Sequence, residues 1–211
     1  MSNDEIEQVV DRMLEQDAER PGFDEIDWGG GEEPVPQGWH RHPNGGGLVQ
    51  DTATVADTAY VGSDARVYGN AKVSGSARIS GSAQVYGSTK VYGDARVYGY
   101  ALVYDNAQVF GNALVSGNAE VYSDALVCGN VRVFGYAWVS GYAQVAGSAK
   151  VYGNAKVSGS AKVCGNVKVY GDVWVSGYAQ VYGSARISGS AKVYGSAMVF
   201  GDEVVDSGER S

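Results

Sequence analysis

The feature that most constrains the fold of this chain is a six-residue repeat. From Val49 to Val205 an aliphatic residue occupies every sixth position without interruption, which makes 27 hexads. A small residue, usually alanine, stands two positions before each aliphatic residue, and glycine followed by Asn, Ser or Asp usually begins two positions after it. Glycine therefore accounts for 31 of the 211 residues, about twice the share of roughly 7% in average proteins.

This repeat predicts short strands separated by sharp corners. Alanine and valine two positions apart point to the same side of an extended segment, so both face one core. The glycine and the polar residue after it tolerate the positive φ that a tight corner needs. A hexad is too short for a hairpin pair or a helix, so each strand must hydrogen-bond to equivalent strands in neighbouring coils. The pattern predicts an all-β parallel solenoid.

The residue types and spacing resemble the hexapeptide-repeat proteins over residues 49–205. The segment from Trp39 to Gly62 (WHRHPNGGGLVQDTATVADTAYVG) is similar to the lead-in of Ala-Val-Gly-rich variants found in phage and bacterial genomes. The resemblance implies a left-handed parallel β-helix, a triangular solenoid with three hexads per coil, and assembly as a homotrimer with parallel axes. The 27 hexads would form nine coils, roughly 43 Å long at ~4.8 Å per coil.

Three segments lie outside the repeat. Residues 1–20 predict an amphipathic helix, because Ser2 and Glu5 fit a capping box and the apolar residues from Ile6 to Leu14 form one stripe. Residues 21–48 predict an acidic Pro/Gly linker and a lead-in turn, and residues 206–211 a C-terminal tail. Acidic side chains near the end of the repeat are expected to discourage stacking of solenoid edges: Asp202, Glu203, Asp206 and Glu209.

The charge is unevenly distributed along the chain. Residues 1–48 contain 12 acidic and 3 basic residues, whereas residues 49–205 contain 10 acidic and 12 basic ones. We do not expect nucleic acid as a partner. The sequence also has no apolar run of the ~20 residues that a membrane span needs, and it begins with acidic residues. We therefore expect a protein of the cytoplasm, or of the cytoplasm of a phage-infected host cell, without a membrane partner.

Folding the sequence at three hexads per coil sorts the outward positions into three faces. The first face carries a tyrosine ladder and two indoles, which are candidates for burial between subunits, although such ladders also stabilise any solenoid. These candidates are Tyr68, Tyr86, Tyr104, Tyr122, Leu102, Trp138 and Trp174.

The third face carries a column of cations beside aromatic residues, a combination that suits an anionic ligand such as a nucleotide. The candidate ligand-binding residues are Arg78, Arg96, Arg132, Lys150, Lys168, Arg186, Tyr98, Phe134, Tyr152 and Tyr170. Such a run of charges usually forms a solvated surface, and the column could also receive the acidic N-terminal segment of this or another subunit.

Candidates for chemistry are few. The repeat body has no histidine, and the only two, His40 and His42, precede the first hexad without a third metal ligand nearby in sequence. We expect them to shape the lead-in turn, with metal binding as the weaker interpretation. The enzymes that this chain resembles use a histidine base at a subunit interface, and most have a loop that interrupts the coils.

Cys128 and Cys164 lie two coils apart, roughly 9–10 Å, too far for a disulfide.

These observations predict a non-catalytic trimeric β-helix scaffold that binds a ligand or protein partner and needs no cofactor. Three alternatives stay open at this point. The protein could sequester an anionic small molecule in clefts between subunits, form a structural or tail-spike component of a phage, or act as a hexapeptide-repeat acyltransferase.

Overall fold

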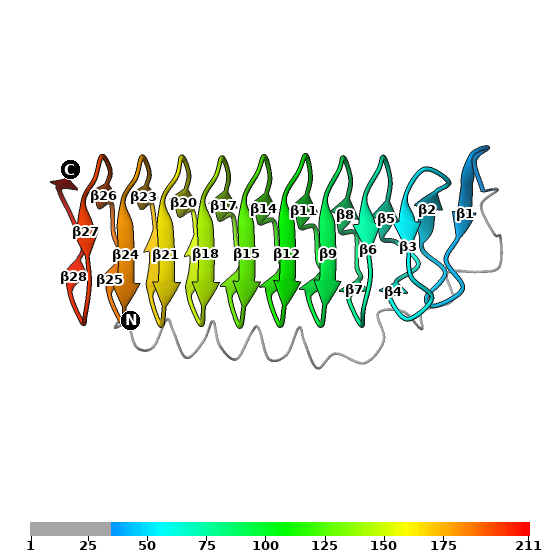
Figure 1. Cartoon of the computed structure of the whole chain (residues 1–211), viewed down its shortest axis with the longest axis horizontal. Helices are drawn as coiled ribbons and strands as arrows, with labels where there is room; N and C mark the ends of the chain where they lie inside the picture. Colours follow the sequence, from blue (N-terminus) through cyan, green and yellow to red (C-terminus); the bar gives the residue numbers. More distant parts are fainter. Residues whose placement is uncertain (1–34) are drawn as a thin grey trace. The chain divides into compact units, whose positions relative to one another are not determined.

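The computed structural model describes residues 35–211, and this part of the chain consists of short β-strands joined by sharp corners (Figure 1). Apart from the first and last strands, each strand pairs in parallel with the strand three hexads further along the chain, as in the register of Val67 with Val85 and of Arg96 with Leu114. This offset confirms three hexads per coil and a parallel β-solenoid of about nine turns. The helix predicted for residues 1–20 lies outside the described residues. No helix within residues 35–211 could span a membrane.

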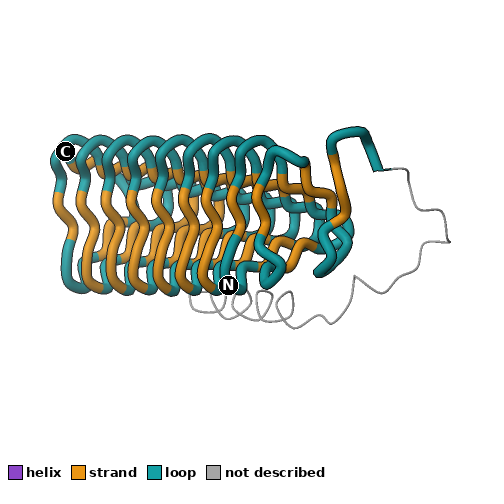
Figure 2. Tube along the Cα trace, turned by 45° about the vertical axis from the view of Figure 1, so that its right-hand side comes forward, coloured by secondary structure: helices purple, strands orange, loops and turns teal. Residues whose placement is uncertain are grey.

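The strands form three sheets, one on each wall of the solenoid (Figures 1 and 2). Sheet A contains β1 (Trp39–Arg41), β2 (Leu48–Gln50), β5 (Arg66–Val67), β8 (Gln84–Val85), β11 (Leu102–Val103), β14 (Glu120–Val121), β17 (Trp138–Val139), β20 (Lys156–Val157), β23 (Trp174–Val175), β26 (Lys192–Val193) and β29 (Glu209–Arg210). Sheet B contains β3 (Thr54–Val55), β6 (Lys72–Val73), β9 (Lys90–Gly93), β12 (Gln108–Gly111), β15 (Leu126–Gly129), β18 (Gln144–Gly147), β21 (Lys162–Gly165), β24 (Gln180–Gly183) and β27 (Met198–Val199). Sheet C contains β4 (Tyr60–Val61), β7 (Arg78–Ile79), β10 (Arg96–Val97), β13 (Leu114–Val115), β16 (Arg132–Val133), β19 (Lys150–Gly153), β22 (Lys168–Gly171), β25 (Arg186–Ile187) and β28 (Val204–Val205).

The coil is left-handed, as the family resemblance implies. In Figure 1 the chain advances from right to left while each coil descends along sheet B at the front. It then passes through sheet C below and returns behind through sheet A. Looking along the direction of advance, the chain therefore turns counterclockwise, which defines a left-handed coil.

The core is a continuous column of alanine and valine. The two inward positions are buried in nearly every hexad, and most of these side chains, such as Ala119 and Val121, have no exposed surface at all. Fully burying a valine stabilises the fold by about 1.5–3 kcal/mol relative to leaving it exposed, and the repeat supplies such a valine or isoleucine in every hexad. Thr89 occupies one small position, where its Oγ1 donates a hydrogen bond to the carbonyl oxygen of Tyr86 (3.2 Å).

The corners explain the glycine columns. Gly147 has a φ of +79°, and a Cβ added there would lie 2.8 Å from the backbone nitrogen of Gly165 in the next coil. The next coil therefore lies too close for a side chain at Gly147. Asp105 and Ser123 occupy the same kind of position with φ values of 60° and 59°. Polar residues beside the glycines hydrogen-bond between coils, as Asn154 Nδ2 does to Asp172 Oδ1 (2.8 Å).

Both ends of the solenoid add a strand to sheet A. At the N-terminal end, β1 pairs with β2 in an antiparallel hairpin, and the amide of His42 donates to the carbonyl oxygen of Gly47 (2.9 Å). At the C-terminal end, β29 pairs with β26, so the last residues continue the sheet. Glu203 stands at an inward small-residue position, but its carboxylate forms an ion pair with Arg210 and stays partly exposed. The ion pair and the remaining solvent contact keep this charge from being buried alone.

Candidate functional site

Sheet C brings the predicted cations together in one column. Arg78 pairs in register with Arg96, and four further cations follow one another in adjacent coils beyond Leu114, which interrupts the column. These four are Arg132, Lys150, Lys168 and Arg186. Neighbouring strands lie ~4.8 Å apart, so the side chains form closely spaced rows of like charge. The six cations therefore stand in two groups on one sheet, two before Leu114 and four after it.

The aromatic residues predicted beside the cations lie on the same sheet but do not form one stack. Phe134, Tyr152 and Tyr170 stack with ring centroids 4.8 and 4.9 Å apart. Tyr98 lies two coils before Phe134, and Ser116 separates them. Phe134 and Tyr152 are buried although their positions point outward, so little of their ring surface is available to a ligand.

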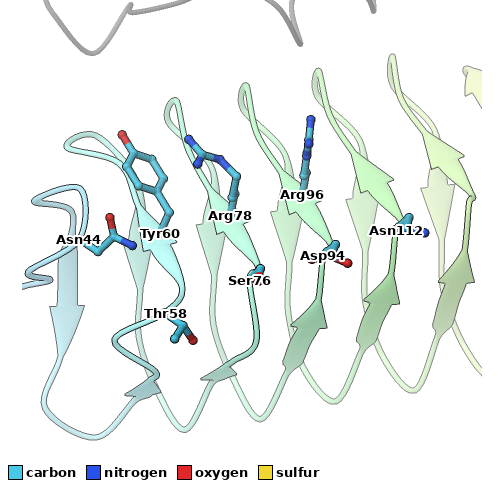
Figure 3. Close-up of a pocket in the computed structure, with 8 residues that line it drawn as sticks. All are labelled: Asn44, Thr58, Tyr60, Ser76, Arg78, Asp94, Arg96 and Asn112. Atoms are coloured by element: carbon cyan, nitrogen blue, oxygen red, sulfur yellow. The ribbon is translucent and has the colours of Figure 1, made fainter.

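A pocket of about 420 Å³ lies at the N-terminal end of sheet C (Figure 3). Its lining consists of Asn44, Thr58, Tyr60, Ser76, Arg78, Asp94, Arg96 and Asn112. Two of these residues, Arg78 and Arg96, belong to the predicted column of cations. Tyr60 could have been found too, because it stands three hexads before Arg78 in the same column. Asn44 could not, since it belongs to the lead-in turn outside the repeat.

The side chains of the pocket form two rows across the coils. Tyr60, Arg78 and Arg96 project side by side from the strands, and Thr58, Ser76, Asp94 and Asn112 follow the corner beside them (Figure 3). The guanidinium carbon of Arg78 lies 4.2 Å from the centroid of the Tyr60 ring. Asn44 Nδ2 donates to the carbonyl oxygen of Ala59 (2.9 Å), which holds that amide in place.

Sheet A carries the tyrosine ladder. Tyr68, Tyr86, Tyr104 and Tyr122 stack with centroids 4.7, 5.0 and 4.9 Å apart, and Trp39 contacts Tyr68 at 5.8 Å. Burial is the main cause that raises the pKa of Tyr68 and of Tyr86. The structure therefore places the ladder as predicted, and its rings support one another.

The C-terminal half of sheet A presents two indoles in the outward column next to that of the tyrosine ladder. Trp138 and Trp174 lie two coils apart with Lys156 between them, and the Lys156 ammonium is 4.4 and 5.2 Å from the two ring centroids. Trp138 is 38% exposed and Trp174 51% exposed. Leu102, the remaining predicted interface residue, lies on the same sheet between Gln84 and Glu120 and is only partly buried.

The two histidines belong to the first hairpin and have separate environments. His40 is exposed, and its Nδ1 lies 2.9 Å from a carboxylate oxygen of Asp51. His42 is buried with Nδ1 3.3 Å from the amide nitrogen of Asn44, and its Nε2 has no hydrogen-bond partner within the described part of the chain. Within residues 35–211 no three His, Cys, Asp or Glu side chains gather as metal ligands. His42 therefore packs inside the lead-in turn.

The two cysteines lie on sheet B with Ala146 in the coil between them. Both thiols are free and partly buried. Burial raises the pKa of Cys128 and of Cys164, which disfavours the reactive thiolate. This environment suits passive thiols.

Four stretches of the chain match the family described as the YdcK Beta solenoid repeat: residues 65–81, 90–105, 107–123 and 125–141. Each stretch covers nearly one coil of the solenoid. No curated protein matches the chain. The chain is thus a β-solenoid repeat protein by both its fold and its sequence, and the narrower hexapeptide-repeat assignment stays a prediction.

Proposed function

We propose that this protein is a non-catalytic homotrimeric scaffold, which self-associates through sheet A and presents sheet C to a ligand or partner. The observation that carries the proposal is the aromatic strip along sheet A. We define this strip as Trp39, Tyr68, Tyr86, Tyr104, Tyr122, Trp138 and Trp174.

The exposed indoles supply a driving force for association. Trp138 and Trp174 expose 38% and 51% of their surface on a rigid wall, where they cannot turn inward because the core is filled. Covering a large apolar side chain is favourable by about 1.5–3 kcal/mol when burial is complete. Exposed aromatic surface of this kind typically marks an interaction site.

The shape of the strip favours side-by-side packing. It runs parallel to the solenoid axis over most coils, so a partner must lie alongside the solenoid to cover it. A closed ring of three subunits with parallel axes covers all copies of the strip without leaving one unpaired. The family resemblance implies the same assembly.

Two features support a role without catalysis. The coils from Val49 to Val205 contain no inserted loop that could close over a substrate. The exposed His40 is oriented by Asp51 as a general base would be, but His40 is not among the residues that line the pocket on sheet C. The scaffold interpretation therefore explains the aromatic strip on sheet A, which the acyltransferase interpretation does not.

Native mass spectrometry of the gently purified full chain tests the assembly. We expect a species of three times the 22.1 kDa mass of one chain. Trp174→Ser should shift the population toward monomer at concentrations where the wild type is trimeric. Met198→Ser is the matched control, because Met198 is 55% exposed on sheet B and should leave the trimer intact.

A monomeric wild type at micromolar concentration would overturn the trimer. Equal dissociation of the Trp174 and Met198 variants would overturn the assignment of sheet A. Turnover of an acyl-CoA donor that is abolished by His40→Ala would overturn the non-catalytic role.

A further inference from the structure

Two arginines occupy adjacent rungs of sheet C without a carboxylate partner in the described part of the chain. Arg78 and Arg96 are in-register partners on β7 and β10, and both are exposed. Like charges directly opposite each other across a sheet destabilise it. None of the ion pairs within residues 35–211 involves either arginine. The pair therefore favours an anion placed between them.

The contact with Tyr60 prepares one arginine for binding. The guanidinium of Arg78 stacks on the Tyr60 ring at 4.2 Å, which restricts a side chain that otherwise samples many rotamers. A stacked guanidinium keeps its N–H donors at its edge, where they remain available to oxygen acceptors. Arg96 offers the N–H donors of a second guanidinium in the next coil.

The two arginines suit a ligand that carries a tetrahedral anion at one end. Two guanidinium forks one rung apart can donate several hydrogen bonds to the terminal oxygens of a single phosphate group. The pocket of about 420 Å³ between the two rows of side chains leaves room for more than the phosphate alone (Figure 3).

The polar side chains along the corner determine which chemical groups the rest of the ligand should carry. Asp94 is the one acidic residue of the pocket lining, and Thr58, Ser76 and Asn112 surround it with polar groups. A carboxylate only accepts hydrogen bonds and repels a bare anion, so it favours a molecule that carries hydroxyl donors beside its phosphate. A purely apolar extension would leave these polar groups without partners.

We propose that the pocket at Arg78 and Arg96 binds a small phosphorylated polyol, such as a sugar phosphate. The phosphate lies against the two guanidiniums, and a ligand hydroxyl donates to Asp94. All eight lining residues come from one chain. The site names the ligand that sheet C presents in the proposed scaffold and so rests on that proposal, but it does not depend on the trimer.

Isothermal titration calorimetry of the full chain in low salt tests this site with three probes: ribose 5-phosphate, inorganic phosphate and ribose. We expect ribose 5-phosphate to bind at least tenfold more tightly than inorganic phosphate, and ribose to give no detectable heat. Arg96→Gln should weaken ribose 5-phosphate binding at least tenfold. Arg186→Gln is the matched control, because Arg186 is an exposed cation of sheet C outside the pocket, and it should change the affinity less than twofold.

Asp94→Asn separates the two parts of the proposal. It should strengthen inorganic phosphate binding while reducing the preference for the sugar phosphate. If the Arg96 and Arg186 variants weaken ribose 5-phosphate binding equally, the ligand is attracted by the whole cation column and not by the pocket. This result would overturn the proposal. Equal affinity for inorganic phosphate and ribose 5-phosphate, or no binding of either at millimolar concentration, would also overturn it.

Failure of this site and failure of the scaffold proposal are distinguishable. Native mass spectrometry of Arg96→Gln should give the same oligomer as the wild type, because Arg96 lies on sheet C and the aromatic strip on sheet A. Loss of ligand binding with an unchanged oligomer supports the site. Dissociation of the oligomer by this substitution would overturn the separation of the two surfaces.

Discussion

The hydroxyl of Tyr104 donates a 2.9 Å hydrogen bond to the carboxylate of Glu120 in the following coil of sheet A. Tyr104 also stacks between Tyr86 and Tyr122. Burial, and then the hydrogen bond and charge of Glu120, raise the pKa of Tyr104 well above its usual range. Tyr104 therefore keeps its hydroxyl proton in the fold at a pH at which an exposed tyrosine loses it.

The raised pKa of Tyr104 predicts a loss of stability at alkaline pH. Above about pH 10 a tyrosine in the unfolded chain releases its proton, whereas Tyr104 in the fold retains it. The native state then binds more protons than the unfolded state, so the free energy of unfolding falls as the pH rises further. Tyr104→Phe should make this fall shallower, while lowering stability at pH 8 by about 0.5–1.5 kcal/mol through loss of the hydrogen bond.

Urea denaturation at pH 8 and at several values between pH 10 and 11.5 measures both effects. Tyr142→Phe is the control, since Tyr142 is an exposed corner residue without a ring partner among the described residues. If Tyr104→Phe loses stability in alkali as steeply as the wild type, the hydroxyl of Tyr104 is not the group responsible.

A corner glycine should be far less replaceable than the serine that occupies an equivalent corner. Gly87 has a φ of +77°, and a Cβ there would lie 2.8 Å from the backbone nitrogen of Asp105. The left-handed conformation alone costs about 1–2 kcal/mol for a residue with a Cβ. Because the close contact adds to this, Gly87→Ala should lower the free energy of unfolding by about 2 kcal/mol or more.

Ser123 supplies the matched comparison, because it already adopts a φ of 59°. Ser123→Gly relieves the conformational strain but increases the entropy of the unfolded chain, so the two effects offset each other to within about 1 kcal/mol. Urea midpoints and m-values of both variants test the contrast. An unchanged midpoint for Gly87→Ala would mean that the corner can open at little energetic expense.

The cysteines should behave as unreactive, unpaired thiols. Cys128 and Cys164 have Ala146 between them in sheet B, and burial raises the pKa of both. We expect alkylation by iodoacetamide at pH 8 to be at least several-fold slower in the native protein than in urea, because less thiolate is present and access is reduced. Mass spectrometry after mild oxidation should show no intramolecular disulfide. Rapid native alkylation would contradict this description.

The sequence predicted those features that the repeat itself determines. The hexad fixes which residues face inward, and three hexads per coil then place Arg78 beside Arg96 and Tyr86 beside Tyr104 in adjacent coils. The pocket went unpredicted because Asn44 lies in the lead-in turn, where no period relates it to sheet C. The pairing of β29 was missed for a similar reason: Glu209 pairs with Lys192 but stands one position short of three full hexads after it, so the hexad count does not reach it.

The C-terminal strand predicts a second pH effect, confined to the end of the solenoid. The Glu209 carboxylate accepts hydrogen bonds from the Tyr194 hydroxyl (2.8 Å) and the Lys192 ammonium (3.0 Å). The bond from Tyr194, followed by the bond and charge of Lys192, lowers the pKa of Glu209. The contribution of this contact to β29 is therefore present above the ordinary carboxyl pKa and is lost as pH falls through the lowered value.

Glu209→Gln should reproduce the acid effect at neutral pH. The amide cannot form the charged contact with Lys192, so amides in residues 203–211 should exchange hydrogen faster at pH 7 than in the wild type. Asp202→Asn is the control, because it removes a carboxylate at the same end whose side chain makes none of the ion pairs found in residues 35–211. Once the pH is below the lowered pKa of Glu209, the wild type and Glu209→Gln should exchange at the same rate, since both then lack the charge. Equal protection of the two proteins at pH 7 would show that backbone pairing with β26 alone holds the last strand.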